Sequence, residues 1–169
     1  MSETPQDRAL HPTDANWQAE QSPGFLLWHL ENLWQREQRK TLEPFDLTAV
    51  QFLLLAGLAA TSAANAAISQ IALARQCRTD PMMTSQVVRS LTRRNLMERA
   101  KDKIDKRAFA VRLTDQGRAL LQAAAPAVRA VEDRFFASLG PDVAAFADAL
   151  RLLGGERPRR RVQAVTRDT

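Results

Sequence analysis

Apolar residues recur at three- and four-residue spacing along most of this chain, and that spacing predicts a mainly helical protein. Two features sharpen the boundaries: Thr48 is placed to cap one helix and Thr114 another, while Gly140 and Pro141 separate the last two. The longest helix contains Pro126, where we expect a bend. The predicted helices cover residues 25–40, 47–58, 68–76, 81–94, 115–139 and 141–153.

A different pattern interrupts the helices between residues 96 and 113. Phe109, Val111 and Leu113 alternate with less apolar neighbours, which is typical of a strand with one buried face. The residues before them form a charged loop that predicts a β-hairpin. Its tip carries four cations and two carboxylates: Lys101, Asp102, Lys103, Asp105, Lys106 and Arg107.

The helix predicted over 81–94 has two chemically distinct faces. Projection at 100° per residue places Thr84, Val87, Val88 and Leu91 on one side, which suits burial against the 68–76 helix. The opposite side carries donors and acceptors that can read base edges in a major groove: Met82, Ser85, Gln86, Arg89 and Arg93. The alternative interpretation is an ordinary solvated surface. Because a short turn, Cys77 to Thr79, joins the two helices, the pattern indicates a helix-turn-helix.

Charge is distributed unevenly and supports a nucleic-acid partner. The whole chain has a formal net charge of +5, yet residues 68–112 alone hold eleven Lys/Arg against four Asp/Glu, a net of +7. Such a segment is typical of a footprint for phosphates, although a basic face without a partner has the same composition. The concentration of charge coincides with the two-faced helix and the hairpin.

Composition argues against several other classes of protein. The two histidines, one cysteine and scattered carboxylates lack the spacing of a metal site or of a nucleophilic triad, and no glycine-rich phosphate loop is present. We therefore expect no enzyme activity, no metal and no cofactor. Cys77 has no internal disulfide partner, and no run of about eighteen apolar residues occurs, so we expect a cytoplasmic protein without a membrane segment. Cys77 is interpreted as a packing thiol, with reactivity left open by nearby Arg75 and Arg78.

Together these motifs resemble the MarR family of bacterial transcription regulators, over about residues 25–150. The matching features follow one another in order: Leu73-Ala74, the two-faced helix, a Leu-x-x-x-x-Leu run from Leu91, Asp-x-Arg-Ala from Asp105, and Leu-Thr-x-x-Gly from Leu113. Asn95 departs from the glycine usual in the family at the end of the recognition helix. Since Asn tolerates the left-handed conformation, the change is mild.

The resemblance implies a winged helix-turn-helix fold: mainly α, with a small antiparallel hairpin as the wing. It implies that Arg107 enters a minor groove and that Asp105 holds its guanidinium in place. The implied DNA contacts on the recognition helix are Thr79, Met82, Met83, Ser85, Gln86, Arg89 and Arg93. Those on the wing are Lys101, Lys103, Asp105, Lys106 and Arg107.

The family also implies a homodimer on a pseudopalindromic site in double-stranded DNA. Apolar residues outside the helix-turn-helix fit this, although an intrachain bundle would use them too. The expected organisation is a mobile N-terminal tail, a dimerisation helix, a DNA-binding lobe, further dimerisation helices and a basic tail, at residues 1–22, 23–46, 47–113, 114–153 and 154–169.

Members of the family often bind small aromatic or anionic effectors. Trp28, His29, Arg36 and Phe52 combine ring surfaces with cationic or switchable donors and are the candidate pocket residues. The same helical spacing also fits plain core packing. The sequence thus predicts a sequence-specific DNA-binding regulator, in particular a repressor relieved by a small molecule. The alternative is a winged helix that serves protein–protein interaction or scaffolding.

Overall fold

The computed structural model describes residues 19–61, 67–101 and 109–156, and all structural statements below concern those residues. It is mainly helical with one small sheet, as the sequence predicts. In chain order the elements are η1 (Ala19–Gln21), α1 (Pro23–Leu42), η2 (Glu43–Phe45), α2 (Ala49–Thr61), β1 (Ile68–Ser69), α3 (Gln70–Gln76), α4 (Pro81–Arg93), β2 (Met97–Lys101), β3 (Phe109–Leu113), α5 (Asp115–Phe136), η3 (Ala137–Asp142) and α6 (Val143–Leu153).

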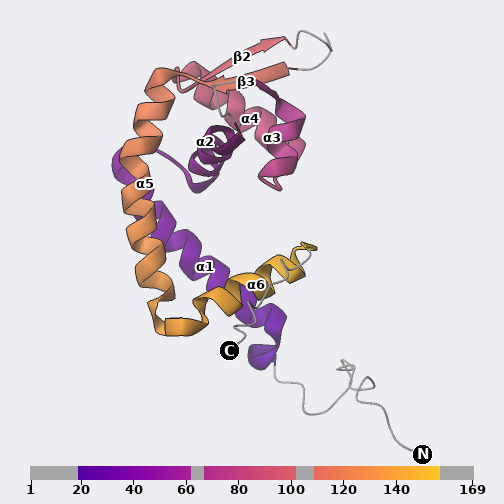
Figure 1. Ribbon diagram of the computed structural model, residues 1–169, viewed down its shortest axis with the longest axis vertical. Coiled ribbons are helices and arrows are strands. Elements are labelled where there is room, and N and C mark those ends of the chain that lie inside the picture. Colours follow the sequence, from indigo (N-terminus) through magenta and orange to yellow (C-terminus); the bar gives the residue numbers. More distant parts are fainter. Residues whose placement is uncertain (1–18, 62–66, 102–108, 157–169) are drawn as a thin grey trace, which may run out of the picture.

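Figure 1 shows two levels connected by a long helix. The upper lobe contains α2, α3, α4 and the sheet, while α1 and α6 lie below it, and α5 runs down one side from the sheet to α6. The main contacts of the lower level are between α1 and α5. We call α1, α5 and α6 the stalk. The lobe is attached to it through the α1–α2 connection and through the junction of β3 with α5.

The sheet differs from the predicted hairpin by one strand. Ile68 and Ser69, which the sequence pattern placed in a helix, pair antiparallel with Val111 and Ala110, so the strand order is β1-β3-β2. β2 pairs with β3 from Met97 opposite Leu113 to Lys101 opposite Phe109. Ser69 ends β1 and caps α3 at once, because its Oγ accepts a hydrogen bond from the Ala72 amide.

Side-chain caps also fix the starts of α2 and α5. Thr48 Oγ1 accepts from the Gln51 amide while Gln51 Oε1 accepts from the Thr48 amide, which is a reciprocal capping box. Thr114 Oγ1 accepts from the amide of Gly117 and caps α5. The predicted caps at Thr48 and Thr114 are confirmed. α5 continues as a helix through Pro126 and ends three residues earlier than predicted.

The core lies inside the lobe, where the helices meet the sheet. Most of its side chains come from α2, α3, α4 and the strands, while α1 contributes Leu42 and α5 contributes Ala124. The fully buried members include Leu54, Leu55, Leu58, Leu73, Val88, Leu91 and Val111. Burial of aliphatic side chains from so many elements holds the recognition elements in one rigid unit.

Aromatic rings join the helices of the stalk. Trp34 of α1 lies 5.1 Å from Phe135 and 5.6 Å from Phe136 between ring centroids, and Phe136 lies 5.9 Å from Phe146 of α6. Further apolar residues of α1 and α6 remain on the surface. No single helix in the described ranges is both long and apolar enough to cross a membrane. Residues 23–45 (α1 with η2) and α2, which meet at an angle of 76°, are together long and apolar enough by length and composition only.

Candidate nucleic-acid interface

Helix α4 is fixed at both ends by its own sequence. Asp80 Oδ1 accepts a hydrogen bond from the Met83 amide at 2.8 Å, and Pro81 occupies the first turn. At the other end Asn95 has a φ of +55°, and the Leu96 amide donates to the Leu91 carbonyl at 2.9 Å. The predicted left-handed cap at Asn95 is confirmed, so α4 begins and ends at defined positions.

The two faces predicted for α4 are present. Thr84, Val88 and Leu91 are fully buried, whereas Gln86, Arg89 and Arg93 are exposed. Met82 at the start of the helix is 76% exposed, although its side chain is large and apolar. The outer face therefore presents an amide, two guanidinium groups and one apolar side chain to a partner.

Three residues from the predicted contact set, Thr79, Met83 and Ser85, are only partly exposed. The Thr79 hydroxyl lies 2.7 Å from the Thr84 hydroxyl and 3.4 Å from the Ala74 carbonyl, so it stabilises the turn rather than facing outward. Met83 is half-buried. The structure thus separates them from the exposed side chains that the sequence grouped with them.

Ser85 positions the side chain of Arg89. Arg89 Nε donates to the Ser85 carbonyl at 3.2 Å, and Nη2 lies 3.5 Å from Ser85 Oγ. These contacts hold the guanidinium against the helix. The guanidinium carries further donors that can bond a base or a phosphate.

The described part of the wing is anchored by cations that the sequence pattern did not single out. The guanidinium of Arg99 lies 3.4 Å from the centroid of the Phe109 ring, and its Nε donates to Gln70 Oε1 at 3.3 Å. On the strand pair, Arg112 Nε donates to Glu98 Oε2 at 2.6 Å. The sequence could have indicated the Glu98–Arg112 ion pair only through the cross-strand register, and that register is not known before the strand pairing is known. Of the predicted wing contacts, Lys101 ends β2, while Lys103, Asp105, Lys106 and Arg107 lie outside the described residues.

A cavity of about 1260 Å³ separates the lobe from the stalk, between α1, α2 and α5. Phe52 and Trp34 are among its lining residues. Trp28, His29 and Arg36 are exposed on α1 and are not among its lining residues, so the four predicted pocket residues are not brought together. The charged lining residues are Glu31, Arg39, Lys40, Glu43, Asp46, Arg94 and Glu132.

Arg94 connects this cavity to the recognition helix. It follows directly after α4, and its side chain is only 29% exposed. Its Nη2 lies 3.0 Å from Asp46 Oδ2, and its Nη1 donates to Gln51 Oε1 at 3.4 Å. The sequence alone suggests that Arg94 is an ordinary surface residue at the end of a helix. Its partner Asp46 could not be recognised, because it lies far away in the sequence.

Cys77 packs inside the helix-turn-helix. The thiol donates to the Leu53 carbonyl at 3.8 Å, and burial raises its pKa. A Cβ added to Gly57 would lie 2.4 Å from Sγ, so α2 and the turn approach each other closely here. The sulfur is therefore in a packing environment, and its thiolate is disfavoured at neutral pH.

Comparison with known proteins indicates which family this fold and this exposed helix belong to. A model of the MarR family matches residues 47–109, which span the lobe from the start of α2 to the start of β3. YdcH from Bacillus subtilis (strain 168), a helix-turn-helix transcriptional regulator, is 42% identical over 117 residues, 69% of this chain and 80% of YdcH.

Solved structures resemble the whole fold. BpsR from Bordetella bronchiseptica, whose DNA binding is regulated by 6-hydroxynicotinic acid, has a TM-score of 0.77 at 25% identity, covering 83% of this chain and 99% of BpsR. A MarR variant from E. coli in complex with operator DNA has a TM-score of 0.68 at 23% identity, covering 78% of this chain and 91% of that one. The second likeness concerns the fold alone.

Proposed function

The chain belongs to the MarR family of transcription regulators, and on that premise we propose that it is a homodimeric, sequence-specific DNA-binding protein whose binding a small molecule relieves. The observation that carries the proposal is the outer face of α4. Gln86, Arg89 and Arg93 are exposed on a helix whose other face packs into the core, so the core fixes where these side chains point. Gln and Arg are the side chains that bond adenine and guanine bidentately.

The wing completes this interface in the proposal. Arg107 enters the minor groove beside the half-site read by α4, and Asp105 braces it, with Lys101, Lys103 and Lys106 on phosphates. The anchoring of Arg99 on Phe109 and Gln70 supports a wing that starts from a rigid base. This role of Arg107 stays a prediction.

The homodimer is proposed from the stalk. Exposed apolar side chains lie at the start of α1 and along α6: Phe25, Leu26, Leu27, Trp28, Val143, Leu150, Leu152 and Leu153. Two copies packed through these faces would cover them and would present two recognition helices to successive half-sites. A sedimentation experiment should give a dimer, and Leu153→Asp should shift it toward the monomer.

The effector is proposed to occupy the cavity between the lobe and the stalk. An aromatic carboxylate fits its lining, because Trp34 and Phe52 supply ring surfaces and Arg94 can exchange Asp46 for the ligand's carboxylate. Since Arg94 directly follows α4, that exchange would move the recognition helix. 6-Hydroxynicotinic acid, which regulates BpsR, is a suitable first probe. We expect it to weaken DNA binding, and we expect Arg94→Gln to reduce this response about tenfold or more.

DNA binding itself is tested by fluorescence anisotropy with a duplex selected from genomic fragments. The logarithm of affinity should fall linearly with the logarithm of salt concentration. Arg89→Ala should weaken binding by about 1–3 kcal/mol. The matched control is Arg129→Ala, which removes the same charge from an exposed position of α5 and should change affinity little. Absent or salt-insensitive binding would favour the protein-interaction alternative instead.

A further inference from the structure

Arg78 occupies a backbone conformation that rarely suits a long side chain. It follows α3 directly after the cap residue Cys77 and has a φ of +51°. Among the residues that the structure describes, the other non-glycine positions with positive φ are Asp46 and Asn95, whose short polar side chains tolerate this region. Glycine or asparagine would satisfy the turn with less strain, so the presence of arginine points to a contact made by its side chain.

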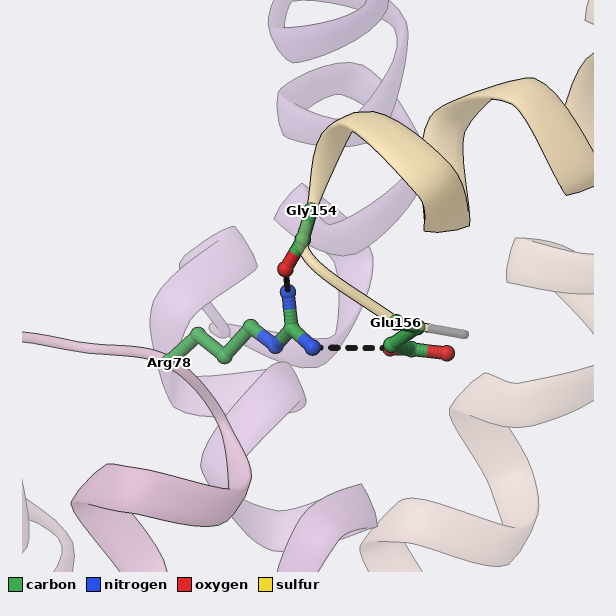
Figure 2. A network of polar contacts seen from close by, with 3 residues as sticks. All are labelled: Arg78, Gly154 and Glu156. Carbon is green, nitrogen blue, oxygen red and sulfur yellow. Dashed lines mark hydrogen bonds and ion pairs between the residues drawn. The ribbon is translucent and has the colours of Figure 1, made fainter. Parts of the chain in front are cut away.

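That contact reaches the C-terminal end of α6 (Figure 2). Arg78 Nη1 donates to the Gly154 carbonyl at 2.6 Å, and Nη2 lies 2.9 Å from Glu156 Oε1. Gly154 is the C-cap of α6, where helix carbonyls lack partners and the helix dipole favours a cation. We call these three residues the clasp. The clasp ties the turn of the helix-turn-helix to the end of the stalk's last helix.

The clasp also changes the charge next to the recognition helix. Arg78 belongs to the segment 68–112 with its net charge of +7, and α4 begins three residues after it. In the clasp, Glu156 neutralises the charge of Arg78. It also occupies guanidinium N–H groups that could otherwise donate to a phosphate. The Arg78 and Glu156 side chains are 56% and 50% exposed, so solvent and a competing anion can reach the pair.

We propose that the clasp is an autoinhibitory contact in which Glu156 and a DNA phosphate compete for Arg78. The inference rests on the proposed DNA binding. The N-terminus of a recognition helix enters the major groove, so the turn that precedes it comes close to the DNA backbone. Exposed ion pairs are weak, and a duplex offers several phosphates, so DNA displaces Glu156 at a modest loss of affinity. The C-terminal end of α6 thereby sets how tightly the lobe binds DNA.

Two variants of the full-length protein open the clasp by different means. Glu156→Gln removes the competing charge. Gly154→Ala changes no charge: its Cβ would lie 2.6 Å from Arg78 Nη1 and push the guanidinium away, while a φ of −72° suits alanine. Asp148→Asn is the control for charge, since it removes a carboxylate from α6 that pairs with Arg151 instead.

The readout is the affinity for one selected duplex across a series of salt concentrations. Glu156→Gln and Gly154→Ala should each tighten binding about two- to fivefold relative to Asp148→Asn and to the unaltered protein. The slope of log affinity against log salt should be shallower by about one in Arg78→Ala than in the proteins that keep Arg78, because one phosphate contact is lost. In an Arg78→Ala background neither variant should have an effect.

Three results would overturn the clasp. They are unchanged binding by Gly154→Ala, equal affinities of Glu156→Gln and Asp148→Asn, and a gain in either clasp variant that persists without Arg78, which would show that the gain does not come from this arginine. Thermal melts of all variants establish that each is folded. Absence of DNA binding by the unaltered protein would overturn both the clasp and the proposed function, whereas normal binding with an inert Gly154→Ala refutes the clasp alone.

Discussion

Gly117 lies where α5 passes the end of the recognition helix, and the structure explains why the Leu-Thr-x-x-Gly motif ends in glycine. Gly117 is buried, and its amide donates to the capping Thr114 hydroxyl at 2.9 Å. A Cβ added there would lie 2.0 Å from the carbonyl oxygen of Leu96 and 2.9 Å from its carbonyl carbon. These are backbone atoms, so no rotamer change can relieve the clash in Gly117→Ala.

The expected loss of stability follows from what must move. Ordinary contact requires the Leu96 carbonyl and α5 to separate by about 1 Å or more, and overpacking of this kind costs about 1–3 kcal/mol. The Leu96 carbonyl also accepts from the Thr114 amide at 3.3 Å, and loss of that hydrogen bond adds about 1 kcal/mol. We therefore expect Gly117→Ala to lower the free energy of unfolding by about 2–4 kcal/mol.

Urea denaturation followed by circular dichroism measures this loss, with all proteins at one concentration because dimerisation would affect the midpoint. Gly24→Ala is the matched control: it makes the same chemical change in α1, where an added Cβ meets nothing within 4 Å. It should be neutral or stabilising by up to about 1 kcal/mol. Equal unfolding free energies for the two variants would refute the packing argument at Gly117.

Three further predictions concern single side chains of the lobe. Met82, 76% exposed at the start of α4, should contact a thymine methyl group. Replacing thymines by uracils in the selected duplex should therefore weaken binding by the unaltered protein but not by Met82→Ala. Equal losses of affinity for the two proteins would contradict this contact. Asn95→Ala should lower unfolding free energy by about 1 kcal/mol because φ is +55°, whereas Asn95→Gly should be close to neutral; equal values would contradict the cap. The raised pKa of the Cys77 thiol means that its folded form stays protonated where the unfolded thiol already ionises, so stability is lost as pH rises through that alkaline window, and Cys77→Ser should flatten this slope.

Local signals in the sequence were sufficient for the recognition helix. Asp80 and Pro81 start α4 and Asn95 ends it, and each acts through its own backbone or its immediate neighbours. The alternation from Phe109 to Leu113 likewise predicted β3, because a strand with one buried face imposes a period of two. Features that depend on three or four consecutive residues are visible without a structure.

Features that depend on distant partners were not predictable in this way. Ile68 and Ser69 form a strand because β3 supplies hydrogen bonds, and two residues are too few to show a period. Arg78 and Arg94 look like ordinary surface cations until the fold brings Glu156 and Asp46 beside them. Tertiary contacts determine the conformation of the first two residues and the ion-pair partners of the two arginines.

The pocket prediction shows the same limit from another side. Helical spacing identified α1 as a helix with aromatic and charged side chains, but it did not say which of its faces turns toward α2 and α5. The structure places Trp34 in the cavity and leaves Trp28, His29 and Arg36 outside its lining. Spacing predicts a face, and packing between helices determines what that face meets.

The central claim is that the outer face of α4 reads base sequence, and selection of binding sites from a randomised duplex library tests it most directly. The unaltered protein should select a motif with two related half-sites, and Gln86→Ala should relax the preference at one or two base positions in each half while the other positions keep theirs. Arg129→Ala should select the original motif. An unchanged motif for Gln86→Ala, or no enriched motif for the unaltered protein, would contradict the account.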